Sequence, residues 1–213
     1  MTANDLFLRT PAKPDATGDA FTPWERRDQI GAVRGLFATL TRAAFSPSTF
    51  FDGLRPDAPW KDAFWYGWLV QALLGALGAV LYLVPILSLH GGALPAPGQL
   101  GLYLLLPLAP VVLYPLLVLV LAGAAHLLAL VAGGAHRGFG ATVRAVCYSG
   151  AAVVFLVSLG PLALWALVIA VYALARLQRT TVPRAAFAVI GAVLLLAIAI
   201  IVPLGIQLAR SLP

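Results

Sequence analysis

Long apolar segments dominate the chain after its first 62 residues, and short polar stretches separate them. The pattern predicts membrane-spanning helices at 63–89, 109–130, 142–158, 161–178 and 185–208. Each segment approaches or exceeds the roughly 17–25 residues that a helix needs to cross the hydrocarbon core of a bilayer. The predicted fold is therefore an all-α polytopic membrane protein, with a bundle of five transmembrane helices over residues 63–210.

Two breaks decide how the apolar segments are divided. Residues 99–132 form a run too long for one straight crossing at about 1.5 Å per residue, and its first half contains Pro107, Pro110 and Pro115. We therefore expect a short interfacial or broken helix near 99–108, followed by the second span. Gly160-Pro161 is a strong turn signal and divides the third apolar region into two rather short spans.

The first 62 residues are polar and divide into a tail and an amphipathic region. Residues 1–23 contain three prolines, which favours a disordered cytosolic tail. Residues 24–62 are predicted to form amphipathic helices on the cytosolic side. Their apolar residues recur at spacings of three and four and share one helical face: Ile30, Val33, Phe37, Leu40 and Ala44. This face, together with Trp24, favours a helix in the membrane interface over a helix packed on a separate cytosolic domain.

Charge is distributed unevenly. All eight acidic residues lie within 1–62, whereas residues 63–213 carry six charges, all of them arginine. Residues 1–62 also hold eight basic residues, so the net charge of +6 belongs to the apolar part and forms no basic patch for nucleic acid. In the five-span arrangement thirteen of the fourteen Lys and Arg residues fall on one side, which predicts a cytoplasmic N-terminus.

The region around the second and third spans resembles the Yip (Ypt-interacting protein) domain family. The resemblance rests on an ordered set of features: His126, the loop Gly133 to Gly140 with its Gly133-Gly134 and Phe139, Thr142-Val143-Arg144, Tyr148-Ser149, and the earlier Ser46-Pro47-Ser48-Thr49-Phe50-Phe51. It implies a five-span membrane protein with a cytosolic N-terminus. The composition suggests a bacterial-type member, placed in the inner membrane.

Two departures from the family pattern limit what the resemblance implies. Gly150-Ala151-Ala152 stands where a proline often follows the tyrosine motif, and the aspartate-rich N-terminal motif of the trafficking members is absent. The role of those members with Rab-type GTPases is therefore not expected here.

Two arginines are candidates for contact with lipid headgroups. Arg137 and Arg144 flank the cytosolic start of the third span. They are either ordinary positive-inside arginines or a shared headgroup site, because basic pockets between spans can bind anionic lipids. The partners expected on this basis are membrane lipids, including anionic ones.

Gln71, His126 and Tyr148 are the candidate buried polar residues. Polar groups at such depth usually face the bundle and find a partner there. We expect Gln71 and His126 to face the interior, and one of them to bond to a polar atom on a different span. A continuous polar cavity lined by all three residues would favour transport, whereas a dry bundle would favour a structural role.

The composition argues against catalysis. Without carboxylates, the membrane part cannot supply paired acids or carboxylate–metal chemistry, and the single Cys147 excludes a cysteine-based metal site. The glycines of 133–140 lack the order of a nucleotide-binding loop. We expect no catalytic, cofactor or metal site, and no nucleic-acid partner. The favoured function is a non-enzymatic membrane protein that organises the bilayer or recruits a protein partner, and the alternative is a small transporter or lipid-handling protein.

Overall fold

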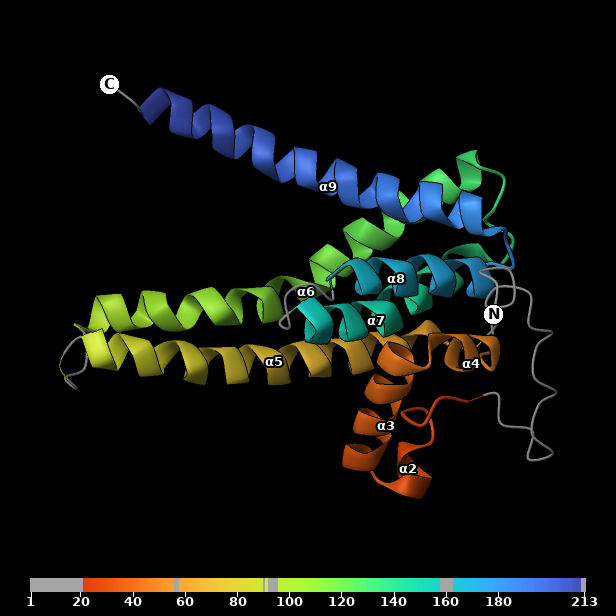
Figure 1. Cartoon of the computed structure of the whole chain (residues 1–213), viewed down its shortest axis with the longest axis horizontal. Helices are drawn as coiled ribbons and strands as arrows, with labels where there is room; N and C mark the ends of the chain where they lie inside the picture. Colours follow the sequence, from red (N-terminus) through yellow and green to blue (C-terminus); the bar gives the residue numbers. More distant parts are fainter. Residues whose placement is uncertain (1–20, 56–57, 90, 92–95, 158–162, 212–213) are drawn as a thin grey trace.

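All regular structure in the described residues is helical, as predicted. The computed structural model describes residues 21–55, 58–89, 91, 96–157 and 163–211. Figure 1 shows the helices in their order along the chain, which is α2 (Arg27–Ile30), α3 (Ala32–Phe45), α4 (Pro47–Asp52), α5 (Trp60–Leu89), α6 (Pro97–Val131), α7 (Gly138–Val157), α8 (Ala163–Leu177) and α9 (Val182–Ser211).

The prediction of five transmembrane helices is wrong in number. Five apolar helices are present near the predicted positions, but within the described residues three are long and apolar enough to cross a membrane: Trp60–Leu89, Val111–Val131 and Val182–Gln207. The apolar stretch of α8, Trp165–Leu177, is too short. Helix α7 holds the buried polar residues Thr142, Arg144 and Ser149 and packs against α3, α5, α6 and α8. Three such helices are consistent with a multi-pass membrane protein.

Helices α7 and α8 pack against each other and return the chain to the side from which α7 began. The segments beside their outer ends are in contact: Arg184 Nη1 at the start of α9 donates to the Gly133 carbonyl at 3.0 Å, and Gln178 Nε2 after α8 donates to the Gly138 carbonyl at the start of α7 at 2.8 Å. Figure 1 places α4 and the start of α5 at this same end and the C-terminus at the opposite end. The described loops 132–137 and 178–181 therefore lie at the same end as the start of α5.

Helix α6 continues through its prolines, so the separate helix expected near 99–108 is instead its first part. In Figure 1 α6 runs beside α5 and then bends toward α9, and it packs against both. Proline removes a main-chain hydrogen bond and is a common cause of such bends. At the α5–α6 contact the Tyr114 hydroxyl lies over Gly67, where a Cβ atom would have no room.

Helix α3 packs directly on the helical bundle and not on a separate N-terminal domain. It runs across the direction of α5 and contacts α7 and α8 (Figure 1). The expected single apolar face is divided: Leu40 and Ala44 are buried against the bundle, whereas Val33 and Phe37 are 71% and 56% exposed. The reason is that the buried side also includes Leu36 and Ala43, which turns the inner face away from the predicted one.

Trp24 is part of the core and not a headgroup anchor. Its side chain is 6% exposed and its ring centroid lies 5.9 Å from that of Tyr66. The indole N–H donates to the Asp62 carbonyl at 3.0 Å, and the main-chain N–H donates to Thr39 Oγ1 at 2.8 Å. Most of the predicted tail, residues 1–20, lies outside the described residues, but Thr22 and Pro23 at its end are buried.

Candidate functional site

A buried ion pair joins the N-terminal segment to α7. Arg144 Nη2 lies 2.9 Å from Glu25 Oε1, and the side chains are 0% and 5% exposed. Arg144 Nη1 also donates to the Arg55 carbonyl, and the Tyr148 hydroxyl donates to the same Glu25 oxygen at 2.8 Å. Because a buried charge is tolerated only when it is paired and hydrogen-bonded, these groups act as one unit. We call Thr22, Glu25, Arg144 and Tyr148 the Arg144 cluster.

Thr22 completes the Arg144 cluster by fixing the carboxylate. Its main-chain N–H donates to Glu25 Oε2 at 2.9 Å, and the Glu25 N–H donates to Thr22 Oγ1 at 3.0 Å. This reciprocal pair of bonds has the form of a capping box. The Thr22 and Tyr148 hydroxyls lie 3.3 Å apart. Both Glu25 oxygens are therefore occupied.

Two further ion pairs also connect the N-terminal region with the helices. Arg27 pairs with Asp62 at 2.9 Å, and Arg176 of α8 pairs with Asp52 of α4 at 2.8 Å. In each ion pair described here the carboxylate comes from residues 1–62, because the chain beyond position 62 contains none. The arginines of the membrane helices can thus be neutralised within this chain only by the N-terminal region.

A second polar group lies between α6, α7 and the α8–α9 loop. His126 Nδ1 and Thr142 Oγ1 are 2.9 Å apart, and the Gln178 amide donates to the same hydroxyl oxygen at 2.7 Å. Gln178 also accepts from the Arg137 N–H at 2.8 Å through Oε1. The prediction is that one of Gln71 and His126 bonds to a polar atom on a different span; His126 does bond to Thr142 of the predicted third span, but that segment, α7, is not among the three candidate membrane spans. Its ring packs edge-on against Phe139, with centroids 5.6 Å apart.

The structure does not bring the sequence candidates together as expected. Arg144 is fully buried in the Arg144 cluster, so it offers no surface for a headgroup site shared with Arg137. Gln71 is partly exposed on α5, and its amide makes no hydrogen bond within the described part of the chain. His126 and Tyr148 belong to separate polar groups. The two cavities described below are lined by none of Gln71, His126 and Tyr148, so they provide no continuous polar path of the kind that would favour transport.

One cavity of about 540 Å³ lies between α4, α8 and the start of α9. Asp52, Tyr172 and Arg176 line one part of it and bond to one another: Tyr172 Oη donates to Asp52 at 3.1 Å and Arg176 Nε donates to Tyr172 Oη at 3.0 Å. Arg179 and Thr181 line another part. Arg179 is exposed and has a φ of 52°, a left-handed conformation uncommon for a residue with a side chain.

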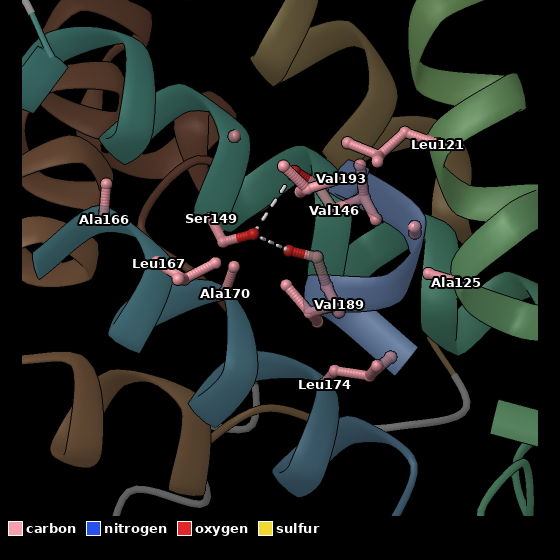
Figure 2. Close-up of a pocket in the computed structure, with 13 residues that line it drawn as sticks. Leu121, Ala125, Val146, Ser149, Ala166, Leu167, Ala170, Leu174, Val189 and Val193 are labelled. Atoms are coloured by element: carbon pink, nitrogen blue, oxygen red, sulfur yellow. Dashed lines mark hydrogen bonds between the residues drawn. The ribbon is translucent and has the colours of Figure 1, made fainter. Parts of the chain in front are cut away.

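A second cavity, of about 370 Å³, is apolar and lies among α6, α7, α8 and α9. Figure 2 shows leucine, valine and alanine side chains around it, with Ser149 as the polar side chain in view. The two cavities use different residues of α8, with Tyr172 and Arg176 at the polar one and Ala170 and Leu174 at the apolar one.

Glu25 and Gln178 are structural partners that sequence reasoning does not identify. A signal for Glu25 exists in the sequence: an arginine placed within an apolar helix needs a carboxylate, and only residues 1–62 can supply one. Gln178 has a weaker signal, since it is a polar residue directly after an apolar helix and reads as part of a loop. Its burial at 0% exposure depends on how α7 and α8 pair.

Comparison of the chain with family models, curated proteins and solved structures found no match. The resemblance to the Yip domain family therefore stays a prediction.

Proposed function

We propose that this chain is a non-enzymatic integral membrane protein that organises the bilayer through α3, which is fixed to the membrane bundle on the cytoplasmic side. The observation that carries the proposal is the outer face of α3. Val33, Phe37 and Phe45 are 71%, 56% and 62% exposed on it, although the opposite face is buried against α7 and α8. These three residues form the outer stripe of α3.

Lipid is the occupant that best fits the outer stripe. Helix α3 runs across α5, so it lies close to the membrane plane when α5 spans the bilayer (Figure 1). Arg34 and Arg42 are exposed on the same helix. Cations beside exposed apolar side chains suit an interfacial helix that inserts among acyl chains and meets anionic headgroups. Recruitment of a protein partner would use the same surface and is the less favoured form of the proposal.

We propose that the protein lies in the bacterial inner membrane with its N-terminus in the cytoplasm. This orientation is supported by the basic residues, since the loops that carry Arg137 and Arg179, and the first turn of α9 with Arg184, lie at the same end as α4 and the start of α5.

Cysteine labelling tests this orientation. In a Cys147→Ser background, Gly98→Cys should react with a membrane-impermeant maleimide in intact cells, because this exposed position at the start of α6 has open space around it. Asp28→Cys, which is exposed near α3, should react only after permeabilisation. The reverse labelling pattern would contradict the proposed orientation.

Vesicle shape tests the proposed function. We expect the protein, reconstituted in phosphatidylethanolamine–phosphatidylglycerol vesicles, to shift their diameter distribution in cryo-electron micrographs. Phe37→Glu should abolish most of this shift, because a charge on the outer stripe opposes insertion. Phe37→Leu is the matched control and should retain it. Vesicles with Phe37→Glu that match the wild type would refute the role of α3, provided that the two proteins unfold at the same temperature.

Lipid handling is the second candidate, and the polar cavity beside α8 is the observation that favours it. Arg176 and Arg179 line this cavity with Asp52 as one opposing carboxylate, and the position fits a phosphate headgroup at the cytoplasmic surface. Native mass spectrometry of the gently purified protein should show fewer retained phosphatidylglycerol molecules after Arg179→Gln than after Arg34→Gln. Equal retention in the two variants would remove this candidate.

A further inference from the structure

The apolar cavity is enclosed by helices that differ in their access to lipid. Leu121 and Ala125 of α6 and Val189 and Val193 of α9 form one part of its wall, and α7 and α8 form the rest (Figure 2). Both α6 and α9 contain candidate membrane spans. In a bilayer the cavity is therefore bordered by two helices whose outer surfaces meet hydrocarbon.

The described residues of the lining offer no polar side chain to a ligand. Among them Ser149 is the one with a hydroxyl, and its Oγ donates to the Ala145 carbonyl at 2.6 Å, with the Val146 carbonyl at 3.4 Å (Figure 2). The Ser149 hydroxyl hydrogen is thus already donated to a main-chain carbonyl of α7 and is not available to a ligand. A water molecule is held in a protein interior by two to four polar partners, and this wall does not provide them. An aqueous solute is excluded for the same reason.

Small side chains create the space, and a close contact between two helices lies beside it. The wall contains Ala125, Ala145, Gly150, Ala166, Ala170 and Ala192. Next to the cavity, Gly191 of α9 approaches Leu128 of α6 so closely that a Cβ atom at Gly191 would lie 2.7 Å from the Leu128 side chain. The Leu128 side chain thus packs directly on the α9 backbone beside the cavity and holds the two helices in contact there.

The surface beside the cavity indicates what reaches it. Leu117 of α6 and Ile190 and Leu194 of α9 are exposed apolar residues near the wall, at 37%, 40% and 56%. In a membrane such residues contact acyl chains. The molecules next to the cavity in a bilayer are therefore lipid acyl chains, and these are as apolar as the residues that line it.

We propose that this cavity holds one hydrocarbon chain of a membrane lipid, inserted between α6 and α9. A bilayer is as apolar as the cavity, so the gain arises from dispersion contacts that fill a void and not from the hydrophobic effect. The site selects for chain shape and not for headgroup. It is independent of the outer stripe of α3 and of the polar cavity beside Arg176.

Photo-crosslinking tests the site directly. The full-length protein is placed in nanodiscs that contain a phosphatidylethanolamine with a diazirine at the middle of one acyl chain, and crosslinked peptides are mapped by mass spectrometry. We expect labels on the α7 and α8 residues of the wall, which the surrounding bilayer does not reach. Ala170→Phe should reduce these labels several-fold, because its ring occupies the cavity. Labels on the exposed face of α9 should stay unchanged.

Two further variants make the result decisive. Ala199→Phe adds the same ring at an exposed position of α9 and should leave the wall labels at the wild-type level. Ala192→Leu fills the cavity from α9 and serves if Ala170→Phe does not fold. Absence of wall labels in the wild type would overturn the proposal. Labels that persist after both filling substitutions would overturn it too.

Discussion

Replacing Arg144 by methionine is expected to destabilise the protein by about 3–5 kcal/mol, the usual cost of removing one partner of a buried ion pair. The substitution leaves Glu25 buried at 5% exposure with the Tyr148 hydroxyl as its remaining side-chain partner on α7. The carboxylate then regains water only if the N-terminal segment leaves the bundle. Thermal unfolding in detergent should show a lower midpoint, and trypsin should cleave faster after Arg26 or Arg27.

Two comparisons separate the ion pair from general effects of the substitution. Arg34→Met removes an exposed arginine of α3 and should leave both the midpoint and the cleavage rate unchanged. The double variant Glu25→Leu with Arg144→Met should be more stable than Arg144→Met alone, since no charge is left buried. A single variant Arg144→Met as stable as the wild type would show that the pair does not hold the N-terminal segment.

Replacing Gln178 by leucine is expected to cost about 1–3 kcal/mol, because three polar groups each lose a hydrogen bond to its buried amide while the side-chain volume is nearly kept. The groups concerned are the Arg137 N–H, the Gly138 carbonyl and the Thr142 hydroxyl. The lost bonds tie the start of α7 to the end of α8. Hydrogen exchange at 137–142 should therefore accelerate along with the fall in the unfolding midpoint.

Gln71 provides the control for this prediction. The same change, Gln71→Leu, removes an amide that makes no hydrogen bond within the described residues, so it should leave stability unchanged or raise it slightly. Equal losses at the two positions would mean that glutamine in this bundle is stabilising for a reason other than its hydrogen bonds.

The positions of the helices could be predicted from the sequence better than their roles. Apolar runs and turn signals located α5, α7, α8 and α9 to within a few residues, because hydrophobic length and glycine–proline pairs act locally. Whether a helix of marginal length crosses the membrane depends on what covers it. The pairing of α7 with α8 and α3 decides this, and no local pattern encodes that pairing.

The candidate site was predictable in its residues and not in its connections. His126, Arg144 and Tyr148 stand out because polar side chains are rare in apolar helices, and all three bond to residues outside their own helix. Their partners Thr142 and Glu25 do not stand out in the sequence, because a threonine near a helix start and a glutamate in a polar segment are both common. The amphipathic pattern of α3 likewise could not show which of its apolar residues pack on the bundle and which stay exposed, since periodicity reports apolar positions but not the surfaces they meet.

The distance along the chain between Glu25 and Arg144 also sets an order of assembly. The two residues are 119 positions apart, with the acid nearer the N-terminus. During synthesis the carboxylate is therefore made well before the arginine that it neutralises, and before α5 and α6 are in place to support either. The N-terminal segment can therefore dock on α7 only after α5 and α6 have been made, so the Glu25–Arg144 pair forms late, once the chain has passed two of its long apolar helices.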